Sequence, residues 1–192
     1  MKTAKILLLL SAVAFVGCAV ESSYARPEHK FLLYRKIAVI SFSNPKDAPA
    51  GQEAADIVAL EFADKAFTVV GSSQLMALIE QSEFYTAGMT PEIKAKLKQS
   101  GIEAVVLGKI SEYSCSNTDL PPTALNIGRK NVCNVSLTAQ MVDINTGEIV
   151  WGATASDTQE GAGLTPKRVL LGLAKKMSLS IPDAPKKPSV KK

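Results

Sequence analysis

The hydrophobic positions of this chain fall into short runs with two different periods. Continuous apolar runs rich in β-branched residues are typical of buried strands, whereas apolar positions spaced three and four apart are typical of helices that pack on one side. Between residues 35 and 181 the two patterns predict the order β-α-β-α-α-β-β-β-α. The predicted strands cover residues 36–42, 67–70, 103–113, 134–144 and 149–155.

The first two predicted helices have clear apolar stripes. A loop containing Pro45, Pro49 and Gly51 precedes the first, because these residues break regular structure. Ser72 or Ser73 is expected to cap the second helix. The stripes are Ala55, Val58, Ala59, Phe62 and Ala66 in the first helix, and Leu75, Leu78 and Ile79 in the second.

The last two predicted helices carry stronger boundary signals. Thr90 and Pro91 form a cap followed by a first-turn proline, and Gly101 lies just past the end of that helix. Thr165 and Pro166 repeat the same start signal near the C-terminus.

The stretch before "VDINTGEIVW" alternates strictly between apolar and polar residues. Such alternation is typical of a half-buried antiparallel strand. Gly147 is expected to supply the positive φ that turns the chain into the return strand. The apolar side is Val135, Leu137, Ala139 and Met141, and the polar side is Asn134, Ser136, Thr138 and Gln140. We therefore predict one α/β (α+β) domain, with a mixed sheet, helices mainly on one face, a late antiparallel meander and a second face that is partly polar.

The N-terminus predicts export and lipid attachment. Lys2 and Lys5 precede an apolar run at residues 6–16, which is too short to span a bilayer and fits a secretory signal peptide. The run ends in "FVGC", which resembles a bacterial lipobox and implies acylation of Cys18. No Asp follows Cys18, so we expect anchoring to the periplasmic face of the outer membrane. The predicted divisions are a signal peptide (1–17), a lipidated Cys18 with a short tether (18–34), the domain (35–181) and a disordered basic tail (182–192).

A second cleavage site is an alternative for the same region. Ser23 and Ala25 fit a signal-peptidase-I site, although Arg26 and Pro27 after the cut make it a poorer one. This alternative also leaves Cys18 without a role.

The charge distribution argues against nucleic-acid binding. The formal net charge is +4, but the signal segment and the tail hold six of the lysines. Residues 19–181 carry 16 basic and 17 acidic residues, which leaves a near-neutral body, whereas nucleic-acid binding needs a basic face.

Cysteine usage suggests a disulfide. If Cys18 carries lipid, Cys115 and Cys133 remain as an even pair in an oxidising compartment. Two free thiols buried at strand ends are the alternative. The chain has a single histidine, His29, in the predicted tether, so we expect neither a metal site nor a triad.

No sequence pattern indicates catalysis or a cofactor. The motifs G-x-S-x-G, H-E-x-x-H and C-x-x-C are absent from the sequence. The stretch 161–167 is Gly-rich and precedes a helix, but it lacks the spacing of a phosphate-binding loop. We expect no catalytic, cofactor-binding or metal-binding residues.

Four segments in order carry a family resemblance: "KIAVISFSNPKDAPAGQEAADIVALEF", "FTVVGSSQL", "IEAVVLGKISEY" and "VDINTGEIVW". Together, over roughly residues 36–155, they resemble the CsgG family of curli production and assembly lipoproteins. That family shares its periplasmic domain with the TolB N-terminal domain and with LpoB-type activators of peptidoglycan synthases.

The chain also departs from that family. The curli exporter builds a membrane barrel from two long hairpins per subunit. Here the first candidate segment carries Pro121 and Pro122 and does not alternate, and the second is too short, so we expect no pore from this protein alone.

The resemblance leaves three hypotheses. The first is a lipid-anchored CsgG-like domain that assists assembly or export of surface material through contacts with other envelope proteins or with further copies of itself. The second is an LpoB-like activator of a peptidoglycan synthase, which would need a longer tether. The third is a small-molecule-binding or enzymatic domain.

Overall fold

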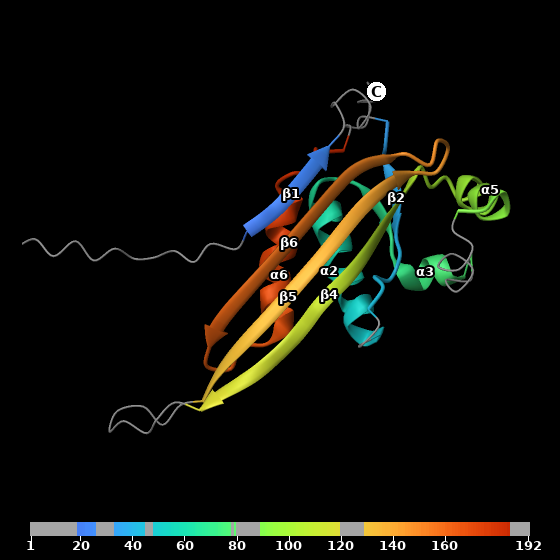
Figure 1. Ribbon diagram of the computed structural model, residues 1–192. Helices are drawn as coiled ribbons and strands as arrows, with labels where there is room; N and C mark the ends of the chain where they lie inside the picture. The colour runs from blue at the N-terminus through green and yellow to red at the C-terminus, as the bar shows by residue number, and fades with distance from the viewer. Residues whose placement is uncertain are drawn as a thin grey trace, which may run out of the picture.

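A single six-stranded mixed sheet and four helices make up the described part of the chain (Figure 1). The computed structural model describes residues 19–25, 33–44, 48–77, 79, 89–119 and 129–184. The strands are β1 (Ala19–Ala25), β2 (Lys36–Val39), β3 (Thr68–Val70), β4 (Ala104–Asp119), β5 (Arg129–Asp143) and β6 (Ile149–Gly161). The helices are α2 (Ala48–Asp64), α3 (Ser72–Met76), α5 (Pro91–Gln99) and α6 (Pro166–Ser178). The predicted fold class is confirmed, and so is the predicted order of elements from β2 to α6.

The sheet has a parallel end and an antiparallel end. Its strand order is β1-β6-β5-β4-β2-β3, and β2 pairs in parallel with both β3 and β4. From β4 to β1 every neighbouring pair is antiparallel. The antiparallel strands are long, and Figure 1 shows β4 and β5 running past α2 and α6 toward the lower left.

The main hydrophobic core lies between the sheet and helices α2 and α6. Trp151 and Phe62 are fully buried at its centre, with ring centroids 5.4 Å apart in an edge-to-face arrangement. Phe67 packs on the other side of Phe62 at 5.5 Å. Such aromatic pairs add a favourable geometric term to the area that they bury.

A smaller core lies on the opposite face of the sheet, at its parallel end. Leu75 of α3 and Leu97 of α5 are buried there against Val105 of β4. Helices therefore cover both faces at this end, whereas at the antiparallel end the described helices cover one face.

The helix boundaries follow the sequence signals at two of the four helices. Thr90 Oγ1 accepts a hydrogen bond from the Ile93 amide at the start of α5, and Thr165 Oγ1 accepts one from the Arg168 amide at the start of α6. Each hydroxyl satisfies an amide that has no partner within its helix.

The other two helices differ from the prediction. Helix α2 begins at Ala48, so Gly51 lies inside it and not in the preceding loop. A Cβ at Gly51 would lie 2.0 Å from the carbonyl oxygen of Phe42, so the close approach of this helix to the segment after β2 requires glycine. Helix α3 is capped by Gly71, with Ser72 already its first residue. Leu78, expected in its apolar stripe, lies outside the described residues.

The N-terminal segment also differs from the prediction. Residues 19–25, expected to be part of a tether, form β1 and pair with β6 from Trp151 to Ser156. The backbone supplies these hydrogen bonds, so the strand can form without an apolar side-chain pattern.

Strands β4 and β5 are longer than expected. Strand β4 continues to Asp119 and β5 begins at Arg129, whereas the predicted strands cover residues 103–113 and 134–144. Pro121 and Pro122 lie outside the described residues. The first residues of the predicted tail are ordered as well, because the Ala184 amide donates to the carbonyl oxygen of Lys65 at 2.8 Å and Ala184 is buried.

Candidate functional site: the open face of the sheet

The antiparallel end of the sheet presents one face that none of the described helices covers. In Figure 1 this face is toward the viewer, with α2 and α6 behind it. We call it the open face. Its residues on β4, β5 and β6 alternate with buried residues, and its residues on β1 lie opposite them in register: Ser22, Tyr24, Leu107, Lys109, Asn134, Ser136, Thr138, Gln140, Gly152, Thr154, Ser156 and Thr158.

Strand register arranges these side chains in rows across the sheet. One row runs from Tyr24 on β1 through Gly152 and Gln140 to Leu107 on β4. Residues directly opposite each other on antiparallel strands have neighbouring side chains on the same face. The open face therefore brings together residues from four strands that are far apart in the sequence.

The next rows are held by hydrogen bonds between hydroxyl and amide groups. The hydroxyls of Thr138 and Thr154 lie 3.1 Å apart across β5 and β6. Further along, Thr158 donates to the Asn134 side-chain oxygen at 2.7 Å. These bonds fix the rotamers of short side chains on an exposed surface, so the face presents a defined array of donors and acceptors.

Two shallow hollows lie next to each other on the open face. The larger, of about 400 Å³, lies over β1, β6 and β5, and the smaller, of about 350 Å³, lies over β5 and β4. Both are lined by Thr138 and Gln140, so they form one continuous depression. The side chain of Gln140 is exposed and makes no hydrogen bond to any other described residue.

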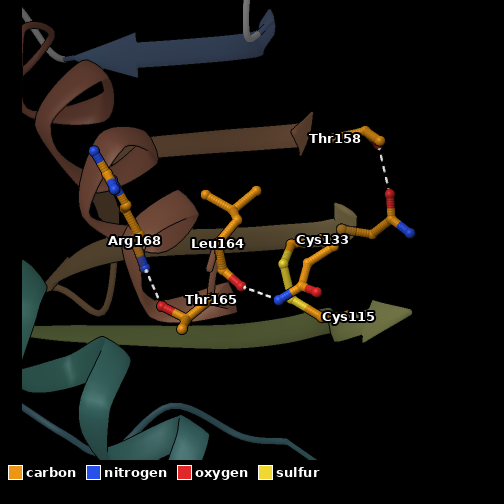
Figure 2. Close-up of a disulfide and its surroundings, with 8 residues drawn as sticks. Cys115, Cys133, Thr158, Leu164, Thr165 and Arg168 are labelled. Carbon is orange, nitrogen blue, oxygen red and sulfur yellow. Dashed lines mark hydrogen bonds between the residues drawn. A yellow bond between two sulfur atoms is a disulfide. The ribbon is translucent and has the colours of Figure 1, made fainter. Parts of the chain in front are cut away.

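The two cysteines that the sequence singled out are joined on the opposite side of the sheet (Figure 2). Cys115 of β4 and Cys133 of β5 are directly opposite each other and form a disulfide. Cys133 is fully buried in the main core. Just beyond it, Asn131 Nδ2 donates to the Leu164 carbonyl oxygen at 2.8 Å, which ties the chain entering α6 to β5. The disulfide lies within the hairpin, four residues before β4 ends.

A charged cluster holds the helices against the same part of the sheet. Lys167 Nζ on α6 lies 2.7 Å from Glu53 Oε1 on α2, and the Tyr113 hydroxyl of β4 donates to Glu53 Oε2. The hydrogen bond from Lys167 is the main cause of a lowered pKa at Glu53, and Tyr113 adds to it, while partial burial opposes both. The cluster is a structural clamp between three elements.

The "VDINTGEIVW" stretch forms the predicted turn, at the other end of the sheet. Asp143 Oδ1 accepts the amides of Asn145 and Thr146 at 2.7 and 2.8 Å, and its Oδ2 accepts the Tyr34 hydroxyl at 2.7 Å. Gly147 has a φ of +77°. Burial is the largest influence on the pKa of Asp143 and acts to raise it, but the hydrogen bonds together outweigh burial and lower the pKa. Both carboxylate oxygens of Asp143 therefore accept hydrogen bonds that stabilise the turn, and the turn is a feature of the fold.

Only some of the residues of the open face and of the disulfide were predicted from the sequence. The prediction identified the polar side of β5 and the cysteine pair, but it placed Tyr24 in a tether. The sequence around Tyr24 has no clear strand pattern, because β1 is held to β6 by backbone hydrogen bonds and not by an apolar face. Cys18, the predicted lipidation site, lies outside the described residues.

The described residues offer no group of three His, Cys, Asp or Glu side chains placed to hold a metal ion. No helix in the described ranges is long and apolar enough to cross a membrane. The open face presents hydroxyl, amide and aromatic groups, from Thr138, Thr154, Gln140 and Tyr24 among others.

No protein-family model matches the chain, and no curated protein matches it. Among solved structures it is similar to the PelC dodecamer from Paraburkholderia phytofirmans, with a TM-score of 0.57 and 20% identity over 86% of this chain and 97% of PelC. It is also similar to lipoprotein GNA1162 from Neisseria meningitidis (TM-score 0.46, 22% identity, 72% of this chain and 90% of that one). A third structure is the LpoB C-terminal domain from Salmonella enterica (TM-score 0.36, 17% identity, 68% and 92%). At 20% identity the likeness to PelC establishes a shared fold.

Proposed function

We propose that this protein is an outer-membrane-anchored periplasmic lipoprotein of the CsgG-like type, which assists assembly or export of surface material through protein–protein contacts. The observation that carries the proposal is the position of β1. The first described residue, Ala19, is already paired with Ser156 of β6, and it directly follows Cys18, the expected lipid attachment site.

The lipid anchor follows from the sequence in front of β1. A single acyl chain binds membranes only marginally, whereas two or more give stable anchoring. Acylation of both the Cys18 sulfur and its new amino group would supply them. Because β1 begins at the next residue, the domain would be held directly against the membrane surface.

Unpaired strand edges support contact with other proteins. Strand β3 is the last strand at the parallel end of the sheet, and among the described strands it pairs only with β2. Exposed edges of this kind are templates for pairing with another chain. PelC, which shares the fold, was solved as a dodecamer. We therefore propose that this chain forms homo-oligomers or pairs with other envelope proteins by this edge.

The role we propose is accessory and not catalytic, and it does not include a pore formed by this chain alone. The candidate hairpin carries the disulfide between Cys115 and Cys133 and a proline pair that would interrupt membrane-spanning strands.

An LpoB-like activator of a cell-wall synthase is the second candidate. Such a role requires the domain to extend far from the membrane. Pairing of Ala19–Ala25 with β6 removes seven residues from the available tether, each worth about 3.5 Å of reach. This observation favours the first candidate.

Fractionation and native mass spectrometry test the proposal. The wild-type protein should be found in outer-membrane fractions with an acylated N-terminus at Cys18, and should be extracted in mild detergent as an oligomer. Cys18→Ala behind a standard secretion signal should give a soluble periplasmic protein.

Three results would count against it. A mature protein that begins at Arg26 without acyl mass would contradict the anchor. A strictly monomeric extract without bound protein would contradict the contact role. Ion conductance by the purified protein in planar bilayers would contradict the pore-free role.

A further inference from the structure

The depression on the open face has the shape and chemistry of a binding site for a sugar polymer. We propose that the open face binds an uncharged glycan chain laid across β1, β6, β5 and β4. This inference goes beyond the proposed function, because it gives the domain a ligand of its own and depends on neither the anchor nor a protein partner.

The dimensions of the depression suit an extended ligand. Its two parts, about 400 and 350 Å³, are each within the size of small-molecule sites. Because strands in a sheet lie about 4.8 Å apart, the path across these four strands is about 14 Å long. That length accommodates more than one sugar ring in a row.

The polar groups in the depression match sugar hydroxyls. A sugar hydroxyl both donates and accepts, and so do the side-chain amide of Gln140 and the hydroxyls of Thr138 and Thr154. Thr138 and Thr154 are bonded to each other, which leaves acceptor capacity on both oxygens. Gln140 lines both hollows, and its side chain makes no hydrogen bond to another described residue.

The floor and the wall of the larger hollow suit a ring. Tyr24 is 54% exposed and stands beside Gly152, which has no side chain to fill the space next to it. The face of a pyranose ring that carries C–H groups packs on an aromatic ring, while the hydroxyls at its edge remain available for hydrogen bonds. Ile149, 43% exposed, adds apolar surface close to Gly152.

The charge of the depression favours an uncharged ligand. Among its lining residues only Lys109 is charged, and it lies at the β4 end. A nucleic acid or polyanion would be expected to require several basic groups. The rest of the lining combines hydroxyl and amide groups with apolar surface from Tyr24, Leu107 and Ile149, which matches the polar edges and the C–H faces of a sugar ring.

Binding of defined oligosaccharides to the mature full-length protein tests the proposal. The protein is kept in a zwitterionic detergent without a sugar headgroup, so that the detergent cannot compete. Calorimetry and saturation-transfer NMR then measure the neutral hexasaccharides of glucose and of N-acetylglucosamine, with the hexamer of galacturonate as the charged counterpart of equal length. We expect one or both neutral hexasaccharides to bind and the charged hexamer to bind more weakly.

Two variants remove the proposed contacts without affecting the fold. Tyr24→Ala removes an exposed ring, and Gly152→Val fills the floor of the larger hollow, where an added Cβ meets its nearest atoms at 3.7 Å or more. Each should weaken neutral-glycan binding about tenfold, by loss of one ring contact or by steric block. Ser114→Ala, on exposed β4 outside both hollows, is the matched control and should bind like wild type.

The opposite results would overturn the proposal. They are no binding of either neutral hexasaccharide, wild-type affinity in both Tyr24→Ala and Gly152→Val, or tighter binding of the galacturonate hexamer that is lost in Lys109→Gln. Cross-linking between two copies through position 24 would also overturn it, because the face would then be covered by a second chain.

Discussion

The two ends of this sheet differ in how many of their faces are covered by helices. At the parallel end, Ala38 and Val39 are adjacent in β2 and both are buried, because α3 and α5 cover one face and α2 covers the other. At the antiparallel end, Leu137 is buried while its neighbour Thr138 is partly exposed on the open face. A strand covered on both faces reads as a continuous apolar run, and a strand covered on one face alternates.

Strand β4 passes from one environment to the other. Val105 and Lys109 lie on the same face of this strand, but Val105 is buried under α5 whereas Lys109 is exposed. The difference shows that helix coverage, and not the strand itself, determines which positions tolerate polar residues. It also leaves one surface of the domain free for recognition.

The largest expected effect comes from placing a charge at the covered end. Val105→Asp buries a carboxylate without a partner, and we expect a loss of on the order of 5 kcal/mol in the free energy of unfolding, or complete failure to fold. Lys109→Asp, four residues further along the same face, should change it by less than about 0.5 kcal/mol. Urea denaturation followed by circular dichroism measures both, and equal losses would contradict the comparison.

The main core beneath the open face should be nearly as sensitive. Trp151→Ala removes the ring packed against Phe62 and should cost about 3–5 kcal/mol. Ser180→Ala removes only the hydroxyl that accepts the Trp151 indole N–H at 3.0 Å, and should cost about 1 kcal/mol. If the two variants are equally stable by denaturant titration, packing around Trp151 contributes less than its burial indicates.

The disulfide should contribute a smaller amount, by constraining the unfolded chain. Replacing both Cys115 and Cys133 by alanine should lower the free energy of unfolding by about 3 kcal/mol, as expected for a closed loop of this length. The matched control is wild-type protein unfolded with excess reductant, which should behave like the double variant. Labelling of two free thiols in protein taken from the periplasm would contradict the bridge.

The smallest effect concerns the clamp at Glu53 and its pH dependence. Because the pKa of Glu53 is lowered in the folded state, its contribution is complete above the pKa of the unfolded state and is lost as the pH falls through the folded value. Glu53→Gln should lower stability at neutral pH by about 1 kcal/mol or less, since both partners are partly exposed. Titration of stability from pH 7 to acid should show a smaller decrease for Glu53→Gln than for wild type, and parallel curves would exclude the clamp.

The elements that pack against the cores could largely be predicted from the sequence, because burial of one face leaves a periodic pattern of apolar residues. The alternation from Asn134 to Met141 reported one buried and one polar face, and Thr90 and Thr165 reported the helix starts. Gly51 misled the prediction, because the same residue type that breaks helices also permits close packing inside one.

The open-face depression could not be predicted, since it depends on pairing between distant segments. The side chains of Glu21, Ser22 and Ser23 form no apolar period, and β1 is held to β6 by backbone hydrogen bonds. Without that pairing Tyr24 has no known neighbour. Tyr24, Gly152 and Gln140 are neighbours only because of the register of three strands, and the register cannot be read from the individual residues.

The pairing of β1 has a mechanical consequence. If Cys18 is acylated as we propose, any force between the membrane and the domain first reaches Ala19 and the ladder to β6. The hydrogen bonds of an antiparallel ladder lie perpendicular to the strands. A pull along β1 therefore loads them all at once and is resisted, whereas a pull across the strand loads them one at a time and peels the strand away. The attachment of the domain would thus resist a force parallel to β1 and give way under a force perpendicular to β1.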